Sequence, residues 1–341
     1  MKKIFINYNA KDNFGDDLFV RIMCNTFPQA KFNTLIPKEF GKGIEKIKNL
    51  KITDLNPKAP EKAYVKAVSK ADICVYLSGQ AFVEEAEDIE EYWDFRYMLR
   101  SKPLYFINTS FGPYYTKNFF SVSRDYISGC EGVWFRDNNS YSMFEGDNVH
   151  YMPDIAYLTE FPDAMVLPKQ YVVLSLVDLS GRPYISVVYD KYIEKMQWIA
   201  QYFKDKGYEV IILASCKYEW DDKAAENLSD LGTVVTYDGN IDYILSVIRG
   251  AECVIGSRFH SIICALAAGV RAIPVCYSDN LKSAVKDFDS EHPCFDVKNL
   301  DDITEEKLNS AILYRTKGSV DAQKAKIRKE LYKLQEIFYK N

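Results

Sequence analysis

The sequence predicts an α/β protein built from two doubly wound domains, and three observations carry this prediction. Short apolar runs alternate with longer stretches of helical periodicity, which is typical of parallel sheets covered by helices. The same alternation occurs in both halves of the chain. The chain has 341 residues, which is long for a single hydrophobic core and sufficient for two domains.

In the first half, runs rich in β-branched and aromatic residues have the length of strands. These runs are 3–8, 72–77, 103–108 and 132–135 (KIFINY, DICVYL, PLYFIN and GVWF). A helix is predicted over 17–27, because Leu18, Ile22 and Met23 fall on one side of it. The first half therefore contains the strands and helices of one α/β layer system.

The second half repeats this organisation. Its predicted strands are 171–176, 209–213, 234–236, 253–255 and 272–277. Pro274 lies within the last of these and indicates a strand end or an edge strand. A helix is predicted over 262–268, and Gly269 ends it.

Domain boundaries follow from the segments between these patterns. Residues 152–170 contain three prolines and no clear period, which is typical of an interdomain linker. We predict domains over 1–160 and 161–303, and a helical tail over 304–341 that packs back on the first domain. Two doubly wound domains facing a cleft would place ligands at the loops that follow the strands.

Composition excludes several classes of protein. The net charge of −5 argues against a nucleic-acid-binding protein, which needs clustered excess Lys and Arg. The eight cysteines show no C-x-x-C and no spacing typical of a metal site, so we expect neither a metal nor a disulfide framework. No apolar run approaches the ~20 residues of a membrane span, and a soluble, cytoplasmic protein is expected.

Two loops in the first half are candidates for binding hydroxyl groups. Asn13, Gly15 and Asp16 follow the first strand, where Asp16 is expected to cap the next helix. A carboxylate at that position repels anions, so this loop suits sugar hydroxyls better than phosphate. Gly79 follows the second strand, where a residue without a side chain lets a ligand approach the backbone.

Cations follow two later strands. Arg136 leaves the end of the strand over 132–135, which would aim it into a cleft, although a local pair with Asp137 is an equal alternative. Residues 257–261 (SRFHS) connect a strand to a helix whose free amide groups attract anions. If this turn is extended, Arg258 and His260 project to the same side. Arg258 would then bind an anion while His260 exchanges a proton.

Taken together and in this order, these motifs resemble those of the polysaccharide pyruvyltransferase family. The matching motifs are Asn-x-Gly-Asp at 13–16, Ser-Gly-Gln at 78–80, Gly-Pro at 112–113, Arg-Asp with a following Ser at 136–140, Asp154, Ser-Arg-x-His-Ser at 257–261, and Tyr277 with Lys282. The resemblance implies two Rossmann-like domains in a glycosyltransferase-B-like arrangement. It also implies transfer of the pyruvyl group of phosphoenolpyruvate onto sugar hydroxyls of a cell-surface polysaccharide or its precursor, with release of phosphate and without a cofactor.

The resemblance assigns roles to these residues. Phosphoenolpyruvate carries a carboxylate and a phosphate, and the expected donor-binding residues are Arg136, Arg258, Lys282, Ser257 and Ser261. The expected acceptor-binding residues are Asn13, Gly15, Asp16 and Gly79. His260, with Arg258, is expected to carry the catalysis, either by deprotonating the hydroxyl or by delivering the proton to the enol carbon.

The chain departs from the family pattern at Ser-Gly-Gln, where many relatives are Gly-rich, and at Phe14, where relatives have a smaller residue. A bulky Phe14 would reshape the acceptor pocket or stack on a sugar. Two alternatives remain: a glycosyltransferase that uses a nucleotide sugar, and a glycan-binding relative without turnover. The Lys-rich segment 38–70 indicates a further partner, an anionic membrane face, and a lipid-linked acceptor is one alternative.

Overall fold

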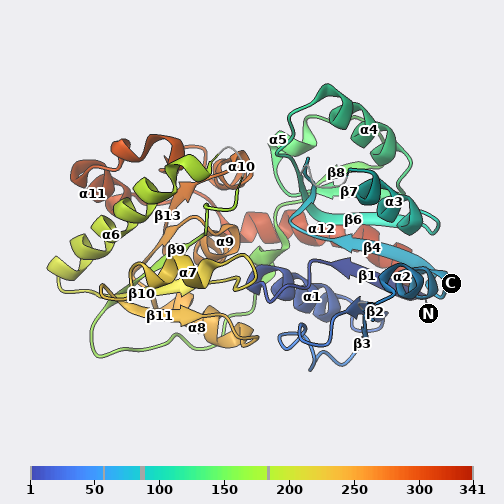
Figure 1. The fold of residues 1–341 in the computed structure, drawn as a ribbon, viewed down its shortest axis with the longest axis horizontal. Helices are drawn as coiled ribbons and strands as arrows, with labels where there is room; N and C mark the ends of the chain where they lie inside the picture. The colour runs from blue at the N-terminus through green and yellow to red at the C-terminus, as the bar shows by residue number, and fades with distance from the viewer. Residues whose placement is uncertain (1, 57, 85–88, 183–184, 340–341) are drawn as a thin grey trace. The chain divides into compact units, whose positions relative to one another are not determined.

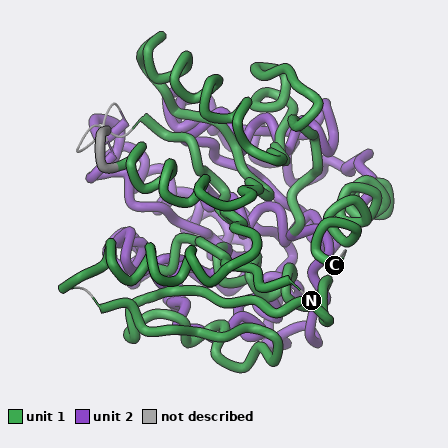
Figure 2. The backbone as a smooth tube through the Cα atoms, turned by 90° about the vertical axis from the view of Figure 1, so that its right-hand side faces the viewer, with its two compact units in different colours: residues 1–10, 16–155, 321–341 green, residues 11–15, 156–320 purple. Residues whose placement is uncertain are grey.

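The computed structural model describes residues 2–56, 58–84, 89–182 and 185–339. They form two compact units, shown in Figures 1 and 2. Unit 1 comprises residues 1–10, 16–155 and 321–341, and unit 2 comprises residues 11–15 and 156–320. Each unit contains a parallel sheet flanked by helices, which confirms the predicted α/β class.

Unit 1 has a parallel sheet with the strand order β3-β2-β1-β4-β6-β7-β8, and β5 pairs with β6 beside this path. Its strands are β1 (Lys3–Tyr8), β2 (Lys31–Ile36), β3 (Leu50–Asp54), β4 (Ile73–Leu77), β5 (Gln80–Phe82), β6 (Leu104–Phe111), β7 (Gly132–Phe135) and β8 (Val149–Tyr151). Its helices are α1 (Phe14–Thr26), α2 (Pro60–Ser69), α3 (Ile89–Leu99), α4 (Lys117–Ser128), α5 (Asn138–Tyr141) and α12 (Val320–Tyr339). The strand order reverses between β1 and β4, which is the position where doubly wound sheets bind ligands.

Unit 2 has a parallel sheet with the order β11-β10-β9-β12-β13-β14. Its strands are β9 (Tyr171–Leu176), β10 (Glu209–Ala214), β11 (Thr233–Thr236), β12 (Cys253–Gly256), β13 (Arg271–Cys276) and β14 (Phe295–Asp296). Its helices are η1 (Ile155–Leu158), η2 (Ser186–Val188), α6 (Tyr189–Asp205), α7 (Asp221–Glu226), α8 (Ile241–Gly250), α9 (Phe259–Ala267), α10 (Asp279–Phe288), η3 (Val297–Asp302) and α11 (Glu305–Leu313). The order reverses between β9 and β12, so the loops after these two strands are the expected ligand position in this unit.

The predicted strands are present in the structure, with ends shifted by at most a few residues. The sequence prediction missed β2, β3, β5, β8 and β14, which are short or carry polar residues. Pro274 is a correction: β13 lies between β12 and β14 and is not an edge strand. The proline is tolerated because β14 pairs only with Val275 and Cys276, so its missing amide hydrogen leaves no bond to β14 unmade.

The division into units differs from the predicted domains at three places. Residues 156–160, predicted to end the first domain, belong to unit 2. Residues 304–320 belong to unit 2, because Leu308 and Ala311 of α11 are buried in its core. Only residues 321–341 join unit 1, where the rings of Phe338 and Phe27 lie 4.9 Å apart. Residues 11–15, placed in the first domain by sequence, belong to unit 2.

Among the described residues, no helix is long and apolar enough to cross a membrane.

Candidate functional site

The loop after β1 packs against the loop after β10 within unit 2. Asn13 forms an isolated antiparallel bridge with Cys216, and the Phe14 amide donates to the Ser215 carbonyl at 3.0 Å. The Lys11 ammonium lies 4.5 Å from the centre of the Tyr218 ring. These backbone contacts explain why a segment from the start of the chain belongs to unit 2.

Phe14 anchors this loop. Its side chain is fully buried, and its ring contacts the edge of Tyr237 at a centroid distance of 5.8 Å. The expectation that Phe14 stacks on a sugar is therefore wrong, because the ring has no exposed face. The bulky residue instead fixes the loop to the end of the unit 2 sheet.

Gly15 is in direct contact with the imidazole ring of His260. A Cβ atom at Gly15 would lie only 1.7 Å from Nδ1 of His260, so the imidazole rests directly on the glycine backbone. His260 is half-buried and lies in the first turn of α9, which follows β12 at the reversal of strand order. Two motifs that are distant in the sequence, Asn-x-Gly-Asp and Ser-Arg-x-His-Ser, therefore meet at this imidazole.

Asn13 takes the capping role expected of Asp16. Its side-chain oxygen accepts a hydrogen bond from the Gly15 amide at 2.9 Å, and α1 begins at Phe14. Asp16 thus lies inside the first turn of α1, where its carboxylate is buried and accepts a long hydrogen bond from Asn9 at 3.5 Å. Negative charge at this end of a helix is favourable.

Arg258 and His260 differ in backbone conformation. Arg258 is extended (φ −74°, ψ 121°) and precedes α9, whereas His260 is already helical. The Arg258 guanidinium forms a two-pronged ion pair with the buried Asp221, in which Nε donates to Oδ2 at 2.6 Å. The condition under which both side chains would project to the same side, an extended turn that reaches His260, is therefore not met, because α9 already begins at Phe259.

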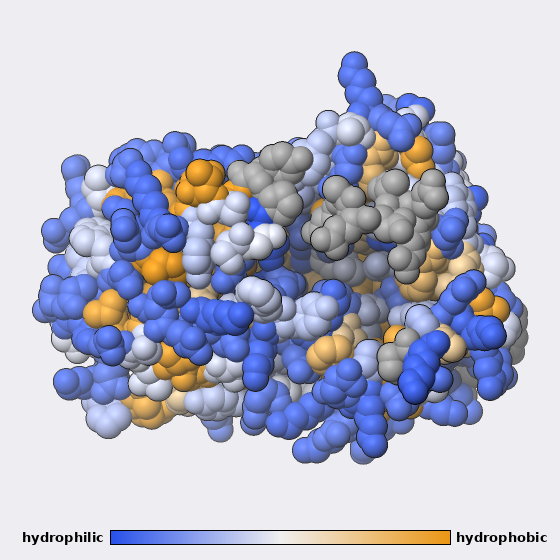
Figure 3. Space-filling view, in the orientation of Figure 1, coloured by the Kyte–Doolittle hydropathy of each residue, from blue (hydrophilic) through white to orange (hydrophobic). Residues whose placement is uncertain are grey.

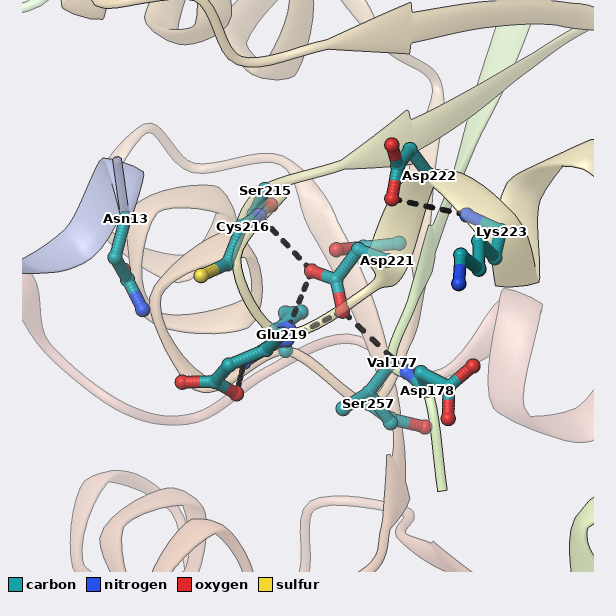
Figure 4. A network of polar contacts seen from close by, with 12 residues as sticks. Asn13, Val177, Asp178, Ser215, Cys216, Glu219, Asp221, Asp222, Lys223 and Ser257 are labelled. Carbon is teal, nitrogen blue, oxygen red and sulfur yellow. Dashed lines mark hydrogen bonds and ion pairs between the residues drawn. The ribbon is translucent and has the colours of Figure 1, made fainter. Parts of the chain in front are cut away.

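Glu219 joins this ion pair to a second arginine. Its Oε2 accepts from Arg258 Nη1 at 2.7 Å and from Arg182 Nη2 at 2.6 Å, so two guanidinium groups converge on one carboxylate oxygen. The Arg182 guanidinium also lies 4.9 Å from the centre of the Tyr277 ring. Figure 4 shows Glu219 and Asp221, and Asp221 also accepts from the amides of Cys216 and Asp178.

The two carboxylates of this network have opposite pKa shifts. The Arg258 guanidinium, helped by Arg182, lowers the pKa of Glu219 to about 2, against the effect of burial. Burial raises the pKa of Asp221 to about 6, although Arg258 acts in the other direction. In the ion-paired arrangement, the two arginines and two carboxylates form a cluster of balanced charge.

We expect Glu219→Gln to remove a stabilising contribution that depends on pH. Because the folded-state pKa of Glu219 lies below its ordinary value of 4.5, this contribution is present above pH 4.5 and is lost as the pH falls towards 2. The free energy of unfolding, measured with denaturant, should therefore differ most between the variant and the wild type above pH 4.5. Glu226→Gln, an exposed carboxylate of the same unit, is the control; an equal pH dependence in both variants would contradict this assignment.

The other predicted donor contacts of unit 2 lie in different environments. Ser257 and Ser261 are fully buried; Ser257 donates to the Tyr192 hydroxyl at 3.1 Å, and Ser261 accepts from Ser175 at 2.7 Å. Lys282 is exposed on α10, and its charge acts on the Cys276 and Cys294 thiols. The structure therefore places the two serines inside the unit and the lysine at its surface.

Arg136 and Gly79 belong to a separate buried cluster in unit 1. Arg136 is 4% exposed, pairs with Asp154 at 3.0 Å and donates from Nε to Ser110 at 3.0 Å. A Cβ atom at Gly79 would lie 2.8 Å from Nη1 of Arg136. The missing side chain at Gly79 therefore leaves space for the guanidinium and does not expose the backbone. The cluster joins the ends of β4, β6 and β7 to the start of the linker.

Sequence reasoning missed Asp178, Arg182, Glu219 and Asp221. The available signal was their position, because they follow β9 and β10 in the segments LVDLSGR and SCKYEWDD. Loops at the carboxyl ends of parallel strands form the ligand crevice of doubly wound sheets. No group of three or more His, Cys, Asp or Glu residues that could hold a metal ion occurs in the described part of the chain.

The fold is similar to that of several solved structures. The MnaA–UDP complex of S. aureus has a TM-score of 0.64 and 10% sequence identity, and the match covers all of this chain and 99% of the other. The UDP-GlcNAc 2-epimerase of Methanocaldococcus jannaschii in complex with UDP-GlcNAc and UDP has a TM-score of 0.60 and 9% identity, with coverage of 97% and 99%. These likenesses support the assignment of two Rossmann-like units.

Sequence comparison gives more specific information. The amylovoran biosynthesis protein AmsJ of Erwinia amylovora is 21% identical over an alignment of 281 positions, and the match covers 73% of this chain. The chain covers 66% of AmsJ, just under two thirds of its length. Residues 13–280 match the family described as polysaccharide pyruvyl transferase, from the Asn13 loop to the start of α10. The chain therefore belongs to the polysaccharide pyruvyl transferase family.

Proposed function

We propose that the protein transfers the pyruvyl group of phosphoenolpyruvate onto two hydroxyls of a sugar in a cell-surface polysaccharide or its precursor. The products are a cyclic ketal and inorganic phosphate, and no cofactor is needed. The observation that carries the proposal is the position of His260, at the strand-order reversal of unit 2, with its ring on Gly15 of the matched family segment. An imidazole exchanges protons near neutral pH, which both halves of this reaction require.

The reaction divides into an addition and a displacement at one carbon. Protonation of the methylene carbon gives a cation-like centre at the phosphate-bearing carbon, which the first sugar hydroxyl attacks while losing its proton. The second hydroxyl then attacks the same carbon and also loses its proton, while the C–O bond to phosphate breaks and inorganic phosphate leaves. His260 either deprotonates an attacking hydroxyl or delivers the proton to the methylene carbon.

Unit 2 would bind the donor through its two convergent arginines. Arg182 and Arg258 already hold one carboxylate, that of Glu219, and the donor carries a carboxylate of the same charge and shape. The free amides at the start of α9 add attraction for an anion. In this proposal the donor carboxylate replaces the Glu219 carboxylate on the two arginines, while the ion pair with Asp221 keeps Arg258 oriented.

The test is to incubate the purified protein with phosphoenolpyruvate and candidate glycans. We expect phosphate release that depends on the glycan, together with a ketal product detected by mass spectrometry. Turnover only with nucleotide sugars would replace the proposal by a glycosyltransferase activity. Glycan binding without turnover of either donor would identify a binding protein instead.

The Gly15→Ala variant tests the contact between Gly15 and the imidazole ring of His260. The added methyl group would occupy the position of the imidazole, so the ring must turn away and kcat should fall by about 10–10²-fold, less than after loss of the imidazole itself. Because both changes remove the same group, Gly15→Ala should have almost no effect in a His260→Asn background. Gly181→Ala, at a glycine with open space around its Cβ position, is the matched control. Independent, additive losses would contradict the contact.

A further inference from the structure

Unit 1 contains a groove at one edge of its sheet, where α2 does not cover the strands. The groove has a volume of about 1400 Å³ and runs between α2 and the edge strand β3, with β2 as part of its floor. It exists because α2 packs over β1 and β2, where Tyr64 contacts Phe5 and Leu35 joins the same core, and the sheet continues beyond the helix to β3. The packing of α2 against the sheet therefore forms the groove at the sheet edge.

The groove is strongly basic. Six lysines line it, against a single acidic side chain, Asp54. The lysines are Lys3, Lys31, Lys48, Lys51, Lys66 and Lys70, and all six side chains are exposed. Within the described residues, none of these ammonium groups forms an ion pair. In Figure 3, hydrophilic side chains gather at the lower right, where Figure 1 shows β2, β3 and α2.

The floor between these lysines is apolar. Leu35 is buried, and Leu50, Ala63 and Ala67 are half-buried along the groove. The only aromatic residue in the lining, Phe32, is 2% exposed, so no ring is available to stack on a sugar or a nucleobase. A basic rim over an apolar floor complements an anionic group attached to an apolar body.

We propose that this groove binds the phosphate headgroups of an anionic lipid surface and holds unit 1 at the membrane–water interface. The lysine ammonium groups contact the phosphates, and the apolar floor receives the glycerol and upper acyl region. Three neighbouring lysines provide the most direct test. Lys66 lies in the last turn of α2, Lys70 is the C-cap residue that follows this helix, and Lys51 lies on β3 across the groove.

The experiment is flotation of the purified protein with vesicles of phosphatidylcholine alone or mixed with phosphatidylglycerol. We expect binding to the anionic vesicles only, and weaker binding as salt is raised. The triple variant Lys51→Gln/Lys66→Gln/Lys70→Gln should lose about fivefold in affinity for each lysine, or about a hundredfold in total. The control Lys117→Gln/Lys326→Gln/Lys329→Gln changes three lysines of the same unit outside the groove and should bind like the wild type.

Three outcomes would overturn the proposal: no binding to anionic vesicles at low salt, equal losses in the two triple variants, or retention on an acidic polysaccharide without vesicle binding. The last would assign the groove to a polymer. Both triple variants should keep the wild-type melting temperature, because all six side chains changed are solvated. Turnover with a soluble acceptor should also be unchanged, so failure of this proposal is distinguishable from failure of the proposed transferase activity.

Discussion

Replacing His260 with Asn should lower kcat for pyruvyl transfer by about 10²–10⁴-fold, the usual effect of removing a proton-transfer group. The expected loss is in kcat because the imidazole acts on atoms that react, whereas the arginines would bind the donor. Asparagine keeps a polar side chain of similar reach at the start of α9, so the free energy of unfolding should change little. Steady-state rates of phosphate release and thermal melting would measure the two effects.

The other histidines provide controls within the same chain. His150 is half-buried in unit 1, with its ring 4.6 Å from that of Trp134, and burial lowers its pKa. His292 is buried in unit 2 and bonds through Nε2 to the Ala272 carbonyl at 2.9 Å. His150→Asn should leave kcat unchanged. His260→Asn should also remove one limb of the pH–rate profile, and an unchanged profile would contradict a proton-transfer role.

The parts of the fold that the sequence predicted are those with strong local patterns. The run KIFINY occupies β1 with its predicted ends because all of its residues after Lys3 are buried, on both faces of a parallel sheet. By contrast, β3 (LKITD) was missed because it is an exposed edge strand with few apolar residues. Local pattern therefore identified central strands and failed at the sheet edge, where pairing with β2 determines the conformation.

The candidate site could be predicted only in part, for a related reason. The motifs around Gly15 and His260 were identified individually, but their contact depends on residues 11–15 joining unit 2. The partners of Arg258 could not be identified, because Asp221 and Glu219 lie almost forty residues before it and belong to a different loop. Sequence indicates which residues follow strands, and tertiary structure decides which of them pair.

Arg258→Ala should destabilise unit 2 by about 3–5 kcal/mol, because it leaves Asp221 buried without its partner. Arg258→Lys should recover only part of this loss, since an ammonium group cannot form the two-pronged pair. Lys307→Ala, which breaks the exposed pair with Asp302, is the control and should cost at most about 1 kcal/mol. Urea unfolding measures all three variants, and an equal effect of Arg258→Ala and Lys307→Ala would contradict the buried pair.

A double variant separates this structural role from donor binding. Arg258→Met/Asp221→Leu removes both charges from the buried pair, so stability should return towards the wild type, as it does when buried ion pairs are replaced by apolar residues. If Arg258 also binds phosphoenolpyruvate, the refolded double variant should still show a KM for the donor raised at least tenfold, because Arg182 alone remains. A wild-type KM in a stable double variant would restrict Arg258 to holding the loops after β10 and β12 together, and would leave Arg182 as the donor-binding cation of this cluster.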